Sequence, residues 1–167
     1  MNPRWRACWL IHLVGDVLAL HLRPDLLDEA AVLMEGTWPA YYGPAGVGCA
    51  MTDLQARCRS EGLPFGIAAL NKDGAVIGVG ALDVTSYGCA PEEPLWLVGL
   101  CVRPQDRKAG VATEIVKALM RHAADAGHGA IYATTHNAVG LLMGLGWAQL
   151  RRFDDASGQW TVLRVAL

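Results

Sequence analysis

The sequence lacks any Cys-x-x-Cys pair, although its 167 residues include five cysteines. Their wide spacing and odd number exclude the usual zinc-ligand patterns and disfavour a secreted disulfide scaffold. We therefore expect reduced thiols that pack as small apolar side chains, and a cytoplasmic protein. The cysteines are Cys8, Cys49, Cys58, Cys89 and Cys101.

An excess of positive charge is also missing. The chain has 14 Lys and Arg against 16 Asp and Glu, for a net charge of −2, which excludes the basic footprint of a nucleic-acid-binding protein. Apolar residues make up 53%, far too many for a disordered chain. The length favours one domain with an ordinary core, so we expect a single domain over residues 1–167.

Two stretches resemble targeting or membrane segments only superficially. The basic start leads into the apolar run ACWLIHLVG, which Asp16 closes without a cleavage pattern. We expect residues 1–16 to form an extra N-terminal arm or strand, with a cleaved signal as the alternative. Residues 127–150 have no Asp, Glu, Lys or Arg but hold polar residues and five glycines, which favours strand, loop and buried helix over a span. We expect no membrane partner.

The periodicity predicts a mixed α/β protein with antiparallel hairpins at both ends. Asn71-Lys72-Asp73-Gly74 joins two apolar runs as a hairpin turn would. Gly99 interrupts an apolar central strand, which suggests a bulge or a close approach to the backbone. Strands are expected over 17–22, 64–70, 75–83, 94–102, 130–134, 149–153 and 159–167, helices over 24–36, 52–61, 110–126 and 137–145, and a loop over 36–50.

The segment of residues 100–112 carries the strongest chemical signal. A buried strand runs through a basic turn directly into the clearest amphipathic helix of the chain. The first amides of a helix have no internal partner, and its dipole favours phosphate there. Gly110 permits close approach, small Ala109 and Ala112 keep it open, and Arg107 and Lys108 add charge. The plainer interpretation is an ordinary strand, turn and helix with a solvated basic turn.

The surrounding run WLVGLCVRPQDRKAGVATEIVKALMRHAADAG resembles the pyrophosphate-binding region of the GCN5-related N-acetyltransferase (GNAT) superfamily. Arg107, Gly110 and Ala112 match that family's Arg/Gln-x-x-Gly-x-Gly/Ala motif. Downstream, TTHNAVGLLMGLGW resembles the family's second element, a short helix that ends in the Leu-Gly-aromatic turn of residues 145–147. With RPDLLDEAAVLMEGTWP and LPFGIAAL, the sequence is most similar to the subgroup that contains the actin N-terminal acetyltransferase.

The resemblance implies a mostly antiparallel central sheet of about seven strands flanked by about four helices. It implies direct transfer of an acetyl group from acetyl-CoA to a primary amine, either a small molecule or a peptide or protein N-terminus. Backbone groups of residues 100–102 would hold the acetyl-pantetheine arm, and the amides of the turn would hold the diphosphate. The implied cofactor-binding residues are Leu100, Cys101, Val102, Arg107, Lys108, Ala109, Gly110, Val111, Ala112 and Thr135.

The sequence departs from the family pattern at the proton-transfer positions. Leu142 stands where many members have a tyrosine that protonates the leaving thiolate, and Val98 and Gly99 stand near the usual strand carboxylate. His136 is then the best candidate for proton handling, with a capping role on the short helix as the alternative. Thr135 replaces the usual asparagine and is expected to hydrogen-bond the acetyl group or the pantetheine.

Other residues have weaker claims on the reaction. Tyr87, Tyr132 and Cys101 are alternative acids, each with a structural role as the plainer interpretation. Glu92 and Glu93 are candidates for a base or an amine-binding pair, or are exposed loop carboxylates. Aromatic residues in the 36–50 loop either wall the acceptor site or pack in the core; these are Trp38, Tyr41 and Tyr42.

Two further classes of chemistry are unsupported. The chain has no Gly-x-Ser-x-Gly elbow, and its remaining histidines show no ligand spacing, so we expect no metal. An acyl-CoA-binding module with little catalysis is the main alternative to an enzyme, and a loop for another phosphorylated ligand is a weaker one. The apolar segment TVLRVAL also suggests a strand that pairs across a homodimer.

Overall fold

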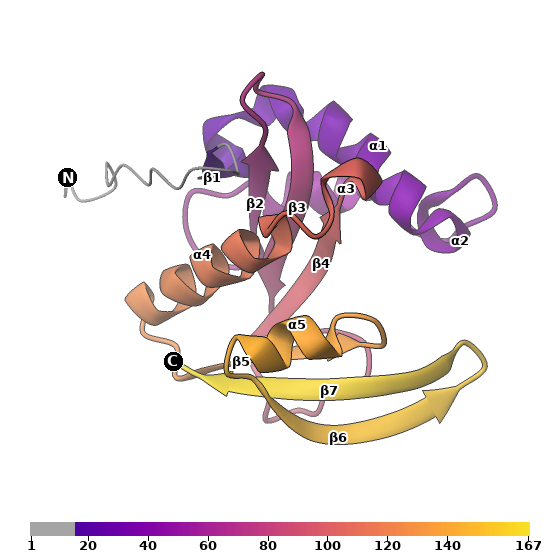
Figure 1. Ribbon diagram of the computed structural model, residues 1–167, viewed down its shortest axis with the longest axis vertical. Helices are drawn as coiled ribbons and strands as arrows, with labels where there is room; N and C mark the ends of the chain where they lie inside the picture. Colours follow the sequence, from indigo (N-terminus) through magenta and orange to yellow (C-terminus); the bar gives the residue numbers. More distant parts are fainter. Residues whose placement is uncertain (1–15) are drawn as a thin grey trace.

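The computed structural model describes residues 16–167, so the expectation for residues 1–15 lies outside the described part of the chain. Seven strands and five α-helices follow one another along it (Figure 1). The strands are β1 Val17–Ala19, β2 Phe65–Leu70, β3 Val76–Asp83, β4 Trp96–Val102, β5 Ala130–Thr135, β6 Ala148–Asp155 and β7 Gly158–Ala166. The α-helices are α1 Leu27–Thr37, α2 Pro39–Tyr42, α3 Ala50–Arg57, α4 Val111–Asp125 and α5 Val139–Gly144, and 3-10 turns cover Leu20–Leu22, Pro24–Leu26 and Pro104–Asp106.

All seven strands belong to one sheet in the order β1-β2-β3-β4-β5-β7-β6. Every neighbouring pair is antiparallel except β4 and β5, which are parallel. The expected hairpins β2-β3 and β6-β7 are both present, at either side of that parallel pair. The fold class and the mostly antiparallel sheet are thus confirmed, with one short helix more than expected.

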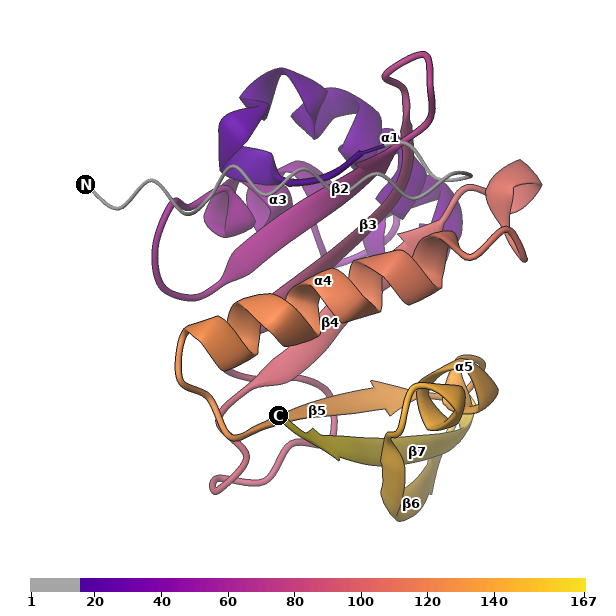
Figure 2. The same ribbon diagram turned by 60° about the vertical axis from the view of Figure 1, so that its left-hand side comes forward.

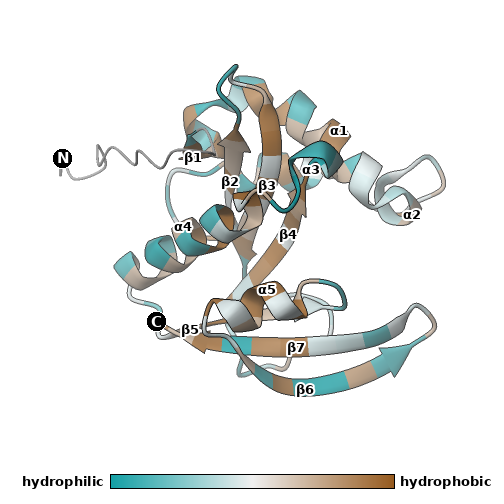
Figure 3. Cartoon of the chain, viewed as in Figure 1, coloured by the Kyte–Doolittle hydropathy of each residue, from teal (hydrophilic) through white to brown (hydrophobic). Residues whose placement is uncertain are grey.

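The helices cover the two faces of the sheet separately. Figure 2 shows α4 lying across one face of the sheet, with α1 and α3 behind the opposite face. The α4 face is sealed by a large apolar cluster that includes Ile115, Leu119 and Leu142. The α1 face is sealed by a smaller cluster that includes Leu20, Met34 and Leu54. In Figure 3 the inner strands are largely brown, whereas much of β6 is teal, as two-sided burial of the inner strands requires.

A bulge interrupts β4 at the glycine that the sequence singled out. Cys101 faces Val79 on β3 and Val98 faces Ala81, so β4 has one residue more than β3 between these pairs. Gly99 has a φ of +60°, a left-handed conformation that glycine adopts without steric cost. The predicted bulge is confirmed, and it bends β4 where the strand separates from β5.

The parallel contact between β4 and β5 is short. Only Trp96 with Tyr132 and Leu97 with Ala133 are paired, and the amide of Tyr132 donates to the Leu95 carbonyl oxygen at 2.9 Å. Leu97 is in the last of these pairs, and Figure 2 shows β4 and β5 diverging. This divergence splits the sheet into a β1–β4 half and a β5–β7 half.

Local packing shifts several boundaries from those expected. Pairing of β1 with β2 stops at Ala19, and the next residue, Leu20, packs on Gly66, where a Cβ would lie 2.7 Å from the Leu20 Cδ1. Helix α1 continues past Gly36 and ends at Thr37, since the residue before Pro39 disfavours helical conformation.

Two further expectations on the N-terminal half were wrong in detail. The region 36–50 is not all loop, because Pro39 opens the single turn of α2. Helix α3 begins at Ala50 rather than at a Thr52-Asp53 cap, and it ends at Arg57. Ala50 is fully buried under α1, so apolar burial fixes the start of this helix.

The C-terminal strand does not lie at an edge. Strand β7 pairs with β5 on one side and with β6 on the other, so TVLRVAL has no free edge for a partner. The reason given above for a homodimer is therefore wrong. Residues 127–150 form strand, loop and helix as predicted, and no helix in residues 16–167 has the length and apolarity to cross a bilayer.

An ion pair ties the β3-β4 connection to the C-terminal hairpin. Glu93 is 5% exposed and accepts hydrogen bonds from both terminal nitrogens of Arg151 on β6 and from the Ala90 amide. Arg151 also donates to the Gly88 carbonyl oxygen at 2.6 Å. The Arg151 guanidinium lowers the pKa of Glu93, although burial opposes this. Glu93 is thus a buried structural carboxylate, contrary to the exposed role considered for it.

We predict that Glu93→Ala lowers the free energy of unfolding by about 2 kcal/mol, because Arg151 and the Ala90 amide lose their shared acceptor. The matched control is Glu92→Ala, at an exposed neighbouring position, which should cost less than about 0.5 kcal/mol. Urea denaturation of both variants measures the difference. Equal losses would contradict a structural role for Glu93.

Candidate active site

The N-terminus of α4 has no side-chain cap. Gly110 occupies the N-cap position with a φ of +86°, and no side chain hydrogen-bonds there. The first internal bond of the helix is donated by Glu114 to the Gly110 carbonyl oxygen at 3.1 Å. The preceding amides of the first turn have no side-chain cap, as the predicted anion site requires.

The turn before α4 exposes its backbone. Lys108 has a φ of +62°, and a Cβ on Gly110 would meet no heavy atom within 4 Å. Arg107 donates through Nε to the Val102 carbonyl oxygen at 3.0 Å, which holds its side chain against the end of β4. Arg103 pairs with Asp106 within the same turn. The turn thus carries two side-chain contacts of its own, an excess of positive charge and open space at Gly110.

This turn follows the free segment of β4. Leu100, Cys101 and Val102 come after the last pair with β5, and the only strand that pairs with this segment in the described chain is β3, while Arg107 occupies the Val102 carbonyl oxygen. Leu100 and Val102 pack with the α4 cluster, whereas Cys101 packs with the α1 cluster. Since the edge toward β5 is unpaired, the backbone here can bond an extended ligand lying between the two strands.

Cys101 is unsuited to supply a proton. Its side chain is buried on the α1 face, and burial raises the pKa of the thiol to about 11. Tyr132 lies next to Trp96 and under Arg164, so it belongs to the packing of the β5-β7 half. Both residues have the structural roles that were the plainer interpretation.

Thr135 and His136 lie at the end of β5, on the opposite side of the divergence from Leu100. The Thr135 hydroxyl oxygen accepts hydrogen bonds from the amides of Ala138, at 3.0 Å, and Asn137, at 3.3 Å, and so shapes the entry to α5. The His136 ring stacks on Trp160 of β7, with centroids 4.0 Å apart. His136 thus packs on β7, which differs from the helix-capping alternative.

Leu142, at the usual position of the family's tyrosine, and Tyr87, an alternative acid, both have contacts elsewhere. Leu142 on α5 is 1% exposed and packs in the α4-face cluster, so this position contributes packing. Tyr87 donates its hydroxyl to Asp155 at 2.5 Å, which raises the pKa of the phenol. Thr134 also donates to the Tyr87 carbonyl oxygen at 2.6 Å, so the 84–95 connection is fixed to the C-terminal hairpin.

A polar network near the bulge was missed from the sequence. Tyr42 donates its hydroxyl to Asp53 at 2.6 Å, and Arg57, one turn later on α3, approaches the same carboxylate at 3.9 Å. Burial and the Asp53 carboxylate raise the pKa of Tyr42 well above its usual range. The i, i+4 spacing of Asp53 and Arg57 was visible in the sequence, but nothing local placed them near Gly99 on β4.

The acetyltransferase (GNAT) family model matches residues 26–162, which include this turn, the diverging strands and α5. The chain belongs to the GNAT family. No curated protein matches the sequence.

Solved GNAT structures have the same fold. An aminoglycoside 6'-N-acetyltransferase in complex with coenzyme A is 15% identical, with 90% of this chain and 96% of that chain covered and a TM-score of 0.72. A GCN5-related N-acetyltransferase from Kribbella flavida is 16% identical over 91% and 97%, with a TM-score of 0.72. The NatC complex bound to Gag peptide and CoA is 14% identical over 91% and 98%, with a TM-score of 0.69. At these identities the likeness concerns the fold.

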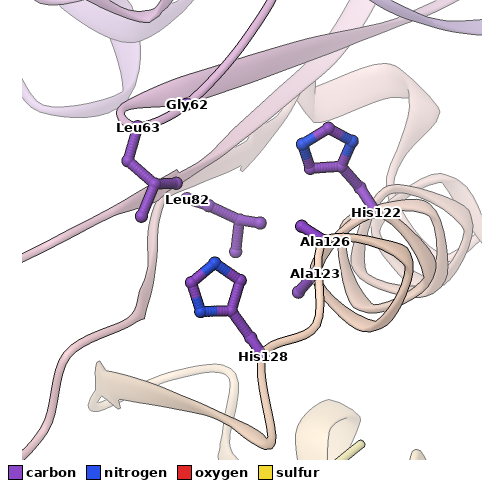
Figure 4. Close-up of a pocket in the computed structure, with 7 residues that line it drawn as sticks. All are labelled: Gly62, Leu63, Leu82, His122, Ala123, Ala126 and His128. Carbon is purple, nitrogen blue, oxygen red and sulfur yellow. The ribbon is translucent and has the colours of Figure 1, made fainter.

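The surface of the described residues has a groove near the N-terminus of α4 and a recess near its C-terminus. A groove of about 310 Å³ lies between α1 and the basic turn, lined by Glu29, Leu33, Val76, Arg103 and Arg107 among others. A smaller recess of about 60 Å³ lies at the far end of α4. Figure 4 shows the rings of His122 and His128 pointing into it, with Leu63 and Leu82 opposite. The small recess is too far along α4 to belong to the turn at its N-terminus.

His122 gives stability a pH dependence. Its ring stacks on Phe65 with centroids 3.6 Å apart, and burial lowers the pKa of the imidazole. His21 and His128 disfavour the imidazolium as well, whereas Asp125 favours it. The unfolded chain therefore binds the proton more readily than the folded protein does, and the free energy of unfolding must fall as pH drops below about 6.5.

We predict that His122→Phe keeps the stacking but loses most of this slope between pH 6.5 and 5. Urea denaturation across that range measures it. At pH 8 the imidazole is neutral in both the folded and the unfolded state. The difference in unfolding free energy between wild type and variant at pH 8 therefore measures packing alone and is the control. Parallel profiles for the two proteins would contradict the assignment.

Proposed function

We propose that the protein is an acetyl-CoA-dependent N-acetyltransferase that acetylates a primary amine directly, with both substrates bound together. The observation that carries the proposal is the uncapped N-terminus of α4, which begins at Gly110 immediately beside the diverging strands β4 and β5. The helix N-terminus suits a diphosphate, and the unpaired strand edge that precedes it along the chain suits an extended arm, so together they match a ligand that has both. Family membership supports acetyl-CoA as that ligand.

The described residues fit coenzyme A. Free amides and open space at Gly110 suit the diphosphate, held by Arg107, Lys108, Ala109, Gly110, Val111 and Ala112. The free edge of residues 100–102 suits the peptide-like pantetheine arm, with Thr135 on the facing strand. Bound acetyl-CoA supplies an activated thioester. The amine nitrogen forms the new C–N bond as the C–S bond breaks, and of the two protons that the ammonium loses, one reaches solvent and one the thiolate.

Solved neighbours support an amine acceptor without fixing its size. One is described as an aminoglycoside acetyltransferase and another as a complex with a peptide. A small amine and a peptide N-terminus both remain candidates. The nearer resemblance to the actin N-terminal acetyltransferase subgroup stays a prediction, because fold and cofactor transfer between relatives better than acceptors do.

A second function is favoured by one observation. No tyrosine stands at position 142, and Leu142 is fully buried. The protein would then bind acyl-CoA with little turnover and act as a sensor or partner subunit. Release of free thiol from acetyl-CoA in the presence of an amine panel separates the two functions, since both require CoA binding.

We predict that Gly110→Glu lowers CoA affinity by at least about 100-fold, because it places a carboxylate at the diphosphate site. Binding is measured by thermal shift, since a ligand of the folded state raises its stability. The matched control is Gly127→Glu, because Gly127 has the same φ of +86° with open space around it at the other end of α4.

The ligand panel for this measurement contains CoA, acetyl-CoA, ATP and NAD. Stabilisation by both CoA species, lost only in Gly110→Glu, supports the proposal. Stabilisation by ATP or NAD alone would contradict the proposal and indicate that the turn binds another phosphorylated ligand. Retained CoA affinity in Gly110→Glu would show that the turn is misassigned.

We predict that His136→Ala slows acetyl transfer by at least tenfold, on the order expected for loss of a proton-transfer group, while CoA affinity stays nearly unchanged. His128→Ala is the control, because His128 lies at the far end of α4. The readout is thiol release at saturating acetyl-CoA. Unchanged turnover would reduce His136 to its stacking contact with Trp160.

A further inference from the structure

The guanidinium of Arg57 lies against the bulge of β4. A Cβ on Gly99 would be 3.0 Å from Nη1 of Arg57 and 3.7 Å from its Cζ. Burial raises the pKa of Cys101, the next residue on this face of β4, and the positive charge of Arg57 opposes that rise. An arginine from α3 is thus fixed at the point where β4 leaves β5, on the face opposite α4.

Arg57 is nearly buried and weakly paired. Its side chain is 12% exposed, and its one ionic contact in the described chain is Asp53 at 3.9 Å. By contrast, Arg23, Arg103 and Arg151 each contact a carboxylate at 2.7 Å or less. Among described residues, only His21 and Trp147 have a fully buried polar side-chain atom that lacks a partner. Arg57 is not one of them, so its unpaired nitrogen atoms are not fully buried and still reach solvent. A confined guanidinium with free donors is suited to bidentate binding of a carboxylate.

Asp53 supplies a negative charge beside Arg57. Tyr42 holds one oxygen of its carboxylate at 2.6 Å, and the side chain remains 36% exposed. Because 3.9 Å is longer than a hydrogen bond, the guanidinium and the carboxylate do not use up each other's hydrogen-bonding capacity. The two side chains therefore present opposite charges at neighbouring positions.

We propose that Arg57 and Asp53 form the acceptor subsite, and that the acceptor is an amine with a carboxylate a few bonds away, an amino acid or a close analogue. This inference rests on the proposed function, which brings the thioester to the free segment of β4. Arg57 binds the carboxylate of the acceptor, and Asp53 binds its ammonium group. The pair matches a zwitterion, whereas a simple amine would leave Arg57 without a partner.

The subsite binds and orients the acceptor. In the transfer, the ammonium first loses one proton to solvent, and the free amine attacks the thioester carbonyl carbon. The C–N bond forms and the C–S bond breaks, and the second amine proton ends on the CoA thiolate. The products are an N-acetyl amino acid and CoA, and no oxidant or reductant takes part.

The test compares each of several small amino acids with its own amide, for example β-alanine with β-alaninamide. The carboxylate raises the pKa of the amine and leaves less of it neutral, so intrinsic reactivity favours the amide. We expect the wild type to prefer the amino acid by at least tenfold in kcat/KM. Arg57→Met, which keeps the length of the stem, should erase that preference through KM while kcat changes little. Arg57→Lys should restore part of it.

The control is Arg59→Met, at an exposed arginine two residues away, which should keep the preference. Thermal melting and CoA binding of every variant show that the fold and the cofactor site persist. Equal use of amino acid and amide by the wild type would overturn the inference while leaving the transferase intact, and so would an Arg57→Met variant that loses both substrates equally.

A binding measurement separates this inference from the proposed function. If no amine releases thiol, the transferase proposal fails. The subsite still requires that β-alanine raise the melting temperature of the CoA complex more than β-alaninamide does. That difference must disappear in Arg57→Met. Absence of that difference overturns the subsite whether or not turnover occurs.

Discussion

The separation of two parallel strands is the constraint on which this structure depends. β4 and β5 share two residue pairs and then part, because the bulge at Gly99 bends β4 away. An unpaired strand edge inside a sheet exposes backbone donors and acceptors that must find partners. An extended ligand with amide groups meets that need, so the same distortion that weakens the sheet prepares it for binding.

The two faces of the sheet carry different charged groups where β4 and β5 diverge. On the α4 face, a helix start without a side-chain cap offers amides to an anion beside Arg107. On the α1 face, Arg57 approaches the bulge from α3 with Asp53 behind it. In the proposed arrangement, the cofactor and the acceptor would each have a charged surface, on opposite faces of one sheet, and would meet where the strands part.

Local sequence chemistry predicted much of this arrangement. The Asn71–Gly74 turn, the amphipathic period of α4 and the glycines at positions 99 and 110 each act within a few residues, and the structure contains all of them. Misjudged features depend on distant partners. Glu93 reads as an exposed loop carboxylate until Arg151, 58 residues later, buries it, and TVLRVAL reads as a free strand until β6 pairs beside it. Arg57 escaped notice for the same reason.

The join between the two half-sheets has a mechanical consequence. Besides the apolar cluster that both half-sheets share under α4, the two β4-β5 residue pairs, the Glu93–Arg151 ion pair and the Tyr87–Asp155 hydrogen bond join the N-terminal half to the C-terminal hairpin. The two residue pairs lie at the narrow end of the divergence, before the free segment of β4 begins. The Glu93–Arg151 ion pair therefore links the relative placement of the two half-sheets to residues that lie outside the free segment of β4.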